Sequence, residues 1–373
     1  MSNNATPAPA SAFPFLFGGF TIPAGCRRIF ITAELETSNN DPRIQPTGFP
    51  DIGPVLYPDP AETNGLICLI ESEASMANWL ETVCFSNKYE GILKETFNGL
   101  PYLKAEKGGE LKTTSTLDGH RFASDFLAKC KAKFSDAIDA KEQTLAEYIK
   151  TTLGMADGKT MPIANVPNVF PLVLGLDTMS LIHGFQVSNE QITFVGLRLP
   201  RALSASVIGL GCERISVPGV KFNAGQLESE SGQAIFQKAR ITAKKIEAHF
   251  SIDVGLLTSL RLDTSGANGT PSLHQAARVQ LLLAIALWKV AAFLDLLSVE
   301  LSLRTECKLR LKRDDKGNAI APKAVCEGGA NRKPGDFPFE VIAAANLADL
   351  ISAALPGTDE ERKARSPRTL QFA

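Results

Sequence analysis

The chain has 373 residues, of which 44% are hydrophobic and 21% are charged, and its 39 Lys and Arg residues nearly balance 40 Asp and Glu residues. This length is enough for a sizeable core and for one or two domains. The composition excludes a disordered or fibrous protein. The net charge of −1 excludes a uniformly basic nucleic-acid binder, although a locally basic surface is compatible with it.

Charge is distributed unevenly along the chain. Residues 1–192 hold 15 basic and 22 acidic side chains, residues 193–313 hold 16 and 9, and residues 314–373 hold 8 and 9. Two interpretations fit the basic middle portion. It is either ordinary clustering on a solvated surface or an electrostatic footprint for a polyanion.

The cysteines form no CxxC pair, and their number is odd. We therefore expect reduced, mostly buried thiols and a cytoplasmic protein. The seven residues are Cys26, Cys68, Cys84, Cys130, Cys212, Cys307 and Cys326.

No targeting or membrane segment is expected. The N-terminus lacks the basic region of a signal peptide. The longest apolar stretch, Val279 to Leu301, is interrupted by Lys289 and Asp295, which favours a buried helix over a membrane span.

The first third of the chain predicts an α+β arrangement. After an irregular segment at 1–25, the β-branched residues at 28–36 predict a strand. The proline-rich residues 41–60 predict a long loop. A buried strand at 65–70 then leads into a helix at 72–81, for which Ser72 is a suitable N-cap.

The middle of the chain is less regular. Residues 86–118 predict an insertion or hairpin, and 120–153 predict two amphipathic helices. Residues 160–171 should interrupt the pattern, so that 154–170 is a second candidate insertion. We expect a strand at 191–199, a Gly- and Ser-rich region at 205–230 and a helix at 232–250, with Lys238, Arg240, Lys244 and Lys245 on its polar side.

The last third contains the clearest patterns. Residues 273–297 predict a central helix, apolar on nearly all sides. Residues 301–313 alternate strictly and predict one long strand with a basic face, followed by a turn at 315–318. That basic face is either the wet side of a sheet or a surface for a phosphate backbone. A last helix at 339–355 and a charged, frayed tail at 356–373 complete the chain.

No catalytic motif is present. The sequence lacks a phosphate-binding P-loop, a GxSxG elbow, an HExxH helix and a complete dinucleotide fingerprint. The four histidines are widely separated. We therefore predict no catalytic residues, no metal and no cofactor.

Several segments together resemble the Cas-seven-type backbone subunit, a member of the RAMP superfamily, of type I-G (formerly I-U) CRISPR effector complexes. The resemblance spans roughly residues 25–313, and the motifs at 75–81 and 200–204 are its most specific parts. The segments are Arg43–Phe49, Cys68–Ser72, Ser75–Glu81, His120–Ala123, Leu199–Ser204 and Leu303–Cys307.

The resemblance implies a ferredoxin-like, RNA-recognition-type palm over 26–355, with inserted finger and thumb elements. It also implies copies stacked along a guide RNA, with bases left exposed for pairing to target DNA and other effector-complex subunits capping the filament ends. Nuclease activity then belongs to a recruited protein. The aspartate with which some related subunits cut RNA has no match here, so a non-catalytic subunit is expected, with no membrane association.

The expected RNA contacts follow from this resemblance and from residue chemistry, because guide binding needs cations and hydroxyl or amide donors. For each arginine the ordinary alternative is a surface ion pair. The candidates are Arg43, Gln45, Ser75, Asn78, Arg121, Arg201, Arg304, Lys308 and Arg310.

Two other functions are compatible with the sequence. One is a backbone subunit of the same superfamily that cleaves RNA through a loop acid. The other is a soluble metabolic enzyme or small-molecule binder whose site forms only in three dimensions.

Overall fold

The structure is a computed structural model. It describes residues 15–17, 20–22, 25–39, 41–49, 53–63, 65–134, 141–155, 161, 163–187, 197–215, 220–221, 235–236, 240–263, 273–304, 307–328, 335–336, 347–355, 357–358, 360–362 and 366–372.

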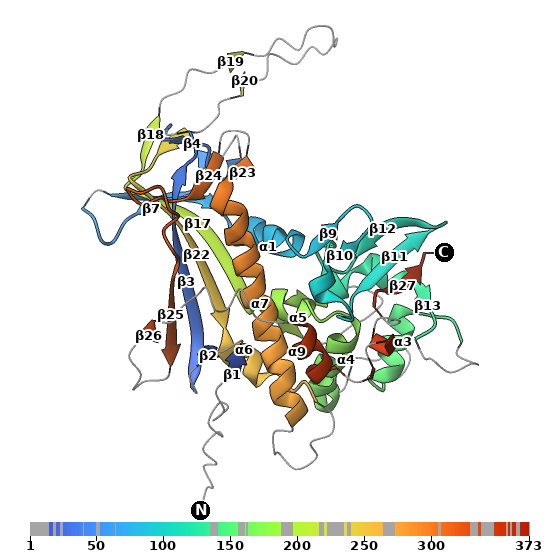
Figure 1. Cartoon of the computed structure of the whole chain (residues 1–373). Coiled ribbons are helices and arrows are strands. Elements are labelled where there is room, and N and C mark those ends of the chain that lie inside the picture. The colour runs from blue at the N-terminus through green and yellow to red at the C-terminus, as the bar shows by residue number, and fades with distance from the viewer. Residues whose placement is uncertain are drawn as a thin grey trace, which may run out of the picture.

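An antiparallel sheet covered on one side by two helices forms the palm (Figure 1). Along the chain its main elements are β3 (Cys26–Thr37), α1 (Glu73–Thr82), β17 (Leu203–Leu210), β22 (Lys245–Asp253), α7 (Leu273–Val299) and β24 (Cys307–Leu311). In the sheet the order is β24-β3-β22-β17, so the first strand lies between the third and the fourth. This is the arrangement of a ferredoxin-like fold, which confirms the predicted α+β class.

Alternating side chains build this sheet. Strand β3 buries Ile29, Ile31, Ala33 and Leu35, and its intervening residues lie on the opposite face. At the far edge β17 pairs with β8 (Leu66–Glu71), and β8 with β7 (Leu56–Pro58). The predictions for β3, β8 and α1 are confirmed, and Ser72 caps α1 by accepting a hydrogen bond from the Ser75 amide at 3.3 Å.

The helix expected at 232–250 is wrong, because β22 occupies the centre of the sheet. Strand β22 buries Ile246, Ala248, Phe250 and Ile252, a period of two that its helix-forming Lys, Glu and Ala residues concealed. The Gly- and Ser-rich region expected from 205 likewise begins inside strand β17.

Helix α7 is the core of the palm, as predicted. Lys289 on this helix is fully buried together with Phe293 and Leu297. Within the described residues, 274–299 is the one helix long and apolar enough to cross a membrane by length and composition. Its burial against the sheet and against α9 (Leu347–Ala354) is that of a core helix.

The single strand expected at 301–313 is wrong, because two strands form a hairpin there. Strand β23 (Leu301–Arg304) pairs with β24, and β24 pairs with residues 35–37 of β3. After a turn at 314–317, β25 (Lys323–Gly328) continues along the same edge and pairs with residues 26–32 of β3. The fourth strand of the palm is therefore split into two pieces.

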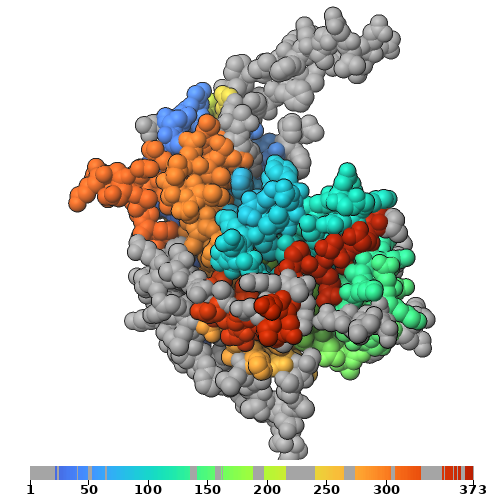
Figure 2. All heavy atoms as spheres, turned by 45° about the vertical axis from the view of Figure 1, so that its right-hand side comes forward, coloured from blue at the N-terminus to red at the C-terminus, as the bar shows by residue number. Residues whose placement is uncertain are grey.

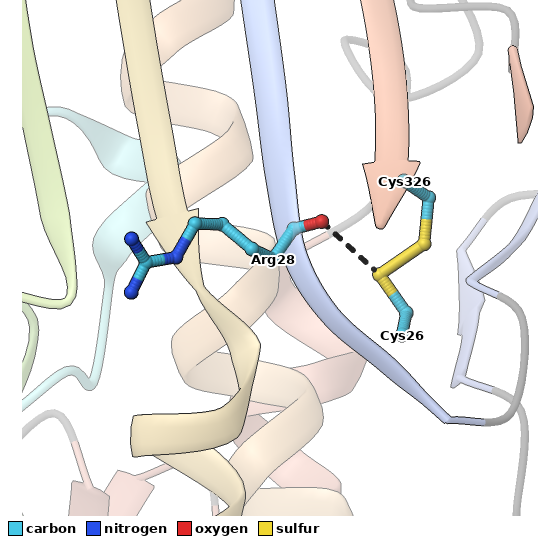
Figure 3. Close-up of a disulfide and its surroundings, with 3 residues drawn as sticks. All are labelled: Cys26, Arg28 and Cys326. Atoms are coloured by element: carbon cyan, nitrogen blue, oxygen red, sulfur yellow. Dashed lines mark hydrogen bonds between the residues drawn. A yellow bond between two sulfur atoms is a disulfide. The ribbon is translucent and has the colours of Figure 1, made fainter. Parts of the chain in front are cut away.

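A disulfide joins Cys26 on β3 to Cys326 on β25 (Figure 3). The expectation that all thiols are reduced is wrong for this pair, whose members lie 300 residues apart. Sequence spacing could not reveal the pair, because only the return of β25 along β3 brings the two residues together. The other five cysteines form no disulfide and are buried.

A second sheet lies beside the palm, on the right of Figure 1. Its order is β12-β11-β27-β13-β14, and its strands are β11 (Leu103–Lys107), β12 (Glu110–Thr114), β13 (Lys131–Ala132), β14 (Gln143–Thr144) and β27 (Arg368–Gln371). The expectation of a frayed tail at 356–373 is therefore wrong for residues 368–371, because β27 is the central strand of this sheet. Four helices accompany this sheet: α2 (Asp125–Lys129), α3 (Leu145–Thr152), α4 (Val166–Leu176) and α5 (Ser180–His183).

Three local expectations also change. The break expected at 160–171 is partly replaced by α4, which accommodates Pro167 in its first turn and Pro171 inside the helix. The irregular segment expected at 1–25 contains the hairpin of β1 (Phe15–Phe17) and β2 (Phe20–Ile22). The expected loop at 41–60 includes β7 and the short strands β4 (Arg43–Ile44), β5 (Gly48–Phe49) and β6 (Gly53–Pro54).

The remaining elements are short. Residues 191–196 and 339–346, where parts of a strand and a helix were expected, lie outside the described residues. The other described elements are β9 (Phe85–Asn87), β10 (Ile92–Leu93), β15 (Phe185–Gln186), β16 (Arg198–Leu199), β18 (Glu213–Ile215), β19 (Val220–Lys221), β20 (Ile235–Phe236), β21 (Arg240–Thr242), β26 (Gly335–Asp336), α6 (Val254–Ser259) and three single-turn helices at 95–97, 121–123 and 163–165.

Candidate nucleic-acid interface

A polar cavity of about 350 Å³ opens at the end of the palm where β3 finishes. Residues 37–39 at the end of β3, Arg43 on β4, Arg240 on β21 and Lys308 on β24 line it. Strand β4 pairs with β21, and β21 pairs with β18, so a small three-stranded sheet forms this end of the molecule (Figure 1). Segments far apart in the sequence thus contribute to one cavity.

Three cations and two carboxylates face this cavity. The cations are Arg43, Arg240 and Lys308, and the carboxylates are Asp41 and Glu300. Lys308 Nζ lies 3.8 Å from Glu300 Oε1, and both side chains are largely exposed. The local balance is positive, which suits an anionic ligand.

Arg43 binds Asp41 through a bidentate pair. Its Nε donates to both carboxylate oxygens at 2.9 Å, and its Nη2 lies 2.5 Å from Oδ2. Hydrogen bonds from the side chain and backbone of Arg43 lower the pKa of Asp41 to about 2. Because 54% of the Arg43 side chain is exposed, this ion pair adds little to the stability of the fold. The forked Arg43 guanidinium fits a phosphate as well as a carboxylate.

The open face of the sheet carries a network of ion pairs. Lys245 on β22 lies 3.0 Å from Glu34 and 2.7 Å from Glu247, and Lys312 lies 3.0 Å from Glu34. Hydrogen bonds from Lys245 and Lys312 lower the pKa of Glu34. The basic side chains of 308–312 lie on one face of the sheet, as the alternation predicted. Two of them pair with acids on β3, Arg310 with Glu36 and Lys312 with Glu34.

The structure brings two of the nine candidate residues together in the cavity, Arg43 and Lys308. Arg310 is next to them on β24, and its Nε donates to Glu36 Oε1 at 2.9 Å. Gln45 is half-buried directly after β4. The side chain of Arg304 lies outside the described residues.

Three other candidates lie elsewhere. Ser75 and Asn78 project from α1, which covers the helical side of the palm. Arg201 is exposed in the loop before β17. None of these three lines the cavity.

Arg121 is an interior residue. It is only 9% exposed, its Nε donates to Glu81 Oε1 at 2.5 Å, and Glu81 is itself buried on α1. This is a buried ion pair between the palm and the segment that follows the β11–β12 hairpin. We therefore do not retain Arg121 as an RNA contact.

Sequence reasoning missed Arg240, Asp41 and Glu300 as cavity residues. Arg240 had been placed on the polar side of a helix that does not form. The short β4–β21 pairing has no hydrophobic pattern that could have revealed it. The alternation of polar and apolar residues in 245–253 was the one sequence signal that could have identified β22 as a strand and not part of a helix.

Comparison with known proteins connects the chain with CRISPR-associated proteins. Residues 29–214, just under half of the chain, match the family model described as "CRISPR-associated protein GSU0053 (Cas_GSU0053)". The match includes Arg43 but ends before Arg240 and Lys308. No curated protein matches the sequence.

Among solved structures, the chain is similar to one described as "CRISPR RNA-guided surveillance complex, pre-nicking". The identity is 13%, and the alignment covers 72% of this chain and 68% of that one. The TM-score is 0.28.

Proposed function

From the CRISPR-associated family match, we propose that the protein is a non-catalytic backbone subunit of a cytoplasmic CRISPR effector complex. Copies assemble along the guide RNA, hold its phosphate backbone independently of sequence and leave its bases free to pair with target DNA. Other subunits of the complex bind at the ends of the filament.

The cavity at the end of the palm is the observation that carries this proposal. Arg43, Arg240 and Lys308 approach it from three separate strands, and Asn39, whose side-chain amide is a hydrogen-bond donor, lines it beside them. Such groups can bind phosphate and sugar, and contacts of that kind let a protein hold RNA of any sequence. An incoming phosphate would replace the Asp41 carboxylate on Arg43.

The test measures guide-RNA binding against salt concentration for Arg43→Gln and Arg240→Gln. Arg28→Gln is a matched control, since Arg28 is also a half-exposed arginine paired with an aspartate, Asp253, but lies at the opposite end of β3. We expect both cavity variants to bind every guide more weakly, with a salt slope shallower by about 0.7 per lost phosphate contact. A loss limited to one guide sequence, or an equal loss in Arg28→Gln, would contradict the proposal.

Assembly and catalysis are tested on the same preparations. We expect the particle size to increase with the length of the guide, and target RNA to remain intact when magnesium or manganese is added. RNA cleavage would instead favour the nuclease alternative. A discrete oligomer free of nucleic acid would favour a small-molecule enzyme or binder.

A further inference from the structure

Strand β27 lies in the second sheet between two strands that are distant from it in sequence. It pairs in parallel with β11, with Leu103 opposite Arg368 and Lys104 opposite Thr369. On its other side Gln371 pairs with Lys131 of β13. Figure 2 shows the C-terminal residues in red on the surface, between the teal β11–β12 hairpin and the green region that follows it.

Main-chain hydrogen bonds secure both ends of the strand. The Arg368 amide donates to the Tyr102 carbonyl at 3.0 Å, and the Phe372 amide donates to the Glu106 carbonyl at 2.8 Å. Just before the strand, the Ser366 hydroxyl donates to the Leu100 carbonyl. Such bonds accept any extended peptide, so selectivity depends on the side chains.

Alternate side chains of β27 make separate contacts with the residues on either side of the strand. Leu370 is fully buried. The Phe372 ring stacks on Phe126 with centroids 4.6 Å apart, and Lys107 Nζ lies 5.0 Å from its centroid.

Arg368 provides a third anchor. Its guanidinium lies 5.3 Å from the centre of the Phe134 ring, and its Nη1 donates to the Lys133 carbonyl at 2.9 Å. Arg368, Leu370 and Phe372 thus occur at every second position, which is the pattern of a peptide bound by strand addition.

The segment before β27 is attached independently. Buried Arg362 donates to the Leu355 carbonyl at 3.3 Å and to the Ser352 hydroxyl at 2.8 Å. These partners belong to α9 and the residue that follows it, and α9 packs on α7. Release of β27 would leave these contacts in place.

We propose that the strand position between β11 and β13 is an acceptor site for an extended peptide, and that a second copy of this chain can supply the occupant. Every copy carries the one sequence already shown to fit, residues 366–372. The four residue steps from Arg362 to Ser366 reach at most about 14 Å, so exchange is limited to adjacent copies. The exchange depends on neither RNA nor the cavity of the palm.

Mixing of two variants, each carrying one added cysteine, tests the exchange in the full chain. Lys104 and Thr369 are register partners, so Lys104→Cys and Thr369→Cys place two thiols side by side only where β27 is docked. The two variants are mixed without guide RNA and oxidised with oxidised glutathione. The control mixture combines Lys104→Cys with Glu327→Cys, whose new cysteine lies on β25. We expect the test mixture to form a covalent dimer in much higher yield than the control mixture.

The double variant Lys104→Cys and Thr369→Cys reports docking within one chain. The proposed exchange between copies is overturned if the two cysteines of this variant form an intramolecular disulfide while the mixed variants form no more dimer than the control mixture. The RNA-binding result for Arg43→Gln stands separately, because the mixture contains no guide.

A peptide-binding measurement tests the acceptor site itself. The full-length Leu370→Asp variant places a carboxylate at the buried position and should release its own strand. A labelled peptide with the sequence of residues 366–373 should bind this variant at least about tenfold more tightly than the wild type, whose tethered strand competes at high effective concentration. A peptide with aspartate in place of both Leu370 and Phe372 is the control. Equal binding of the two peptides by folded Leu370→Asp would overturn the proposed site.

Discussion

Lys289 Nζ donates to His183 Nε2 at 2.7 Å, and both side chains are fully buried. Lys289 belongs to α7 of the palm and His183 to α5, beside the second sheet. The other ring nitrogen, Nδ1, lies 4.0 Å from Glu81 Oε1, and Glu81 accepts from Arg121. A buried polar cluster therefore joins the palm helices to the helices of the inserted region.

This cluster predicts that acid weakens the fold through His183. Burial, followed by the positive charges of Lys289, Arg121 and Arg201, holds the pKa of His183 well below its usual value of 6.5. The unfolded chain therefore binds a proton first as the pH falls. The stabilising contribution of neutral His183 to the free energy of unfolding is fully present above about pH 6.5 and is lost progressively below that pH.

Urea denaturation of the wild type and His183→Gln between pH 8 and pH 5 checks this. We expect the advantage of the wild type to shrink as the pH falls. The two proteins must be compared because burial raises the pKa values of Glu81 and Asp177. Their contributions to the free energy of unfolding therefore increase as the pH falls, opposite to that of His183. A constant difference across this range would contradict the assignment.

Removal of Lys289 should destabilise the protein. Lys289→Met preserves most of the volume but leaves His183 without its donor, and we expect a loss of about 1–3 kcal/mol in unfolding free energy. Adding His183→Leu should recover part of that loss, because neither polar partner remains. A double-mutant cycle by chemical denaturation measures the coupling, and additive effects would show that the contact is unimportant.

Arg121→Ala should affect stability rather than RNA binding. It would leave the buried Glu81 carboxylate without its main partner, at a cost of about 3–5 kcal/mol. Thermal unfolding measures this cost. Guide binding by the remaining folded fraction should match the wild type, in contrast to Arg43→Gln, and a shallower salt slope for Arg121→Ala would restore it as an RNA contact.

Reduction of the Cys26–Cys326 disulfide should lower the unfolding free energy by about 2–5 kcal/mol, because the bond closes a loop of 300 residues. Denaturation with and without a thiol reductant measures the difference. The double variant Cys26→Ser and Cys326→Ser is the control and should not respond to reductant. An equal response in the control would assign the effect to the other five cysteines.

Period-two and period-3.6 patterns predicted the central framework. The alternation in β3, the capped start of α1 and the apolar length of α7 each correspond to burial against one sheet. Strand β22 was missed because its Lys, Glu and Ala residues also suit a helix, and tertiary pairing with β3 and β17 decided its conformation.

The site was only partly predictable. Arg43 and Lys308 were both candidates, but their convergence depends on β4 and β24 meeting at the end of β3. Arg121 could not be distinguished from a surface arginine, because its burial depends on Glu81, forty residues away. The position of β27 depends on a pairing across more than 250 residues, for which a single sequence carries no local signal.

The split fourth strand of the palm also has a practical consequence. Between β24 and β25 the chain leaves the sheet, turns at Gly317 and returns, and the Ile320 amide donates to the Lys312 carbonyl at the base of this excursion. An epitope tag or fluorophore-labelling sequence inserted after Lys316 would lengthen an exposed tip and leave the ladders on β3 in place. The turn is thus a suitable attachment point for tracking the protein during assembly.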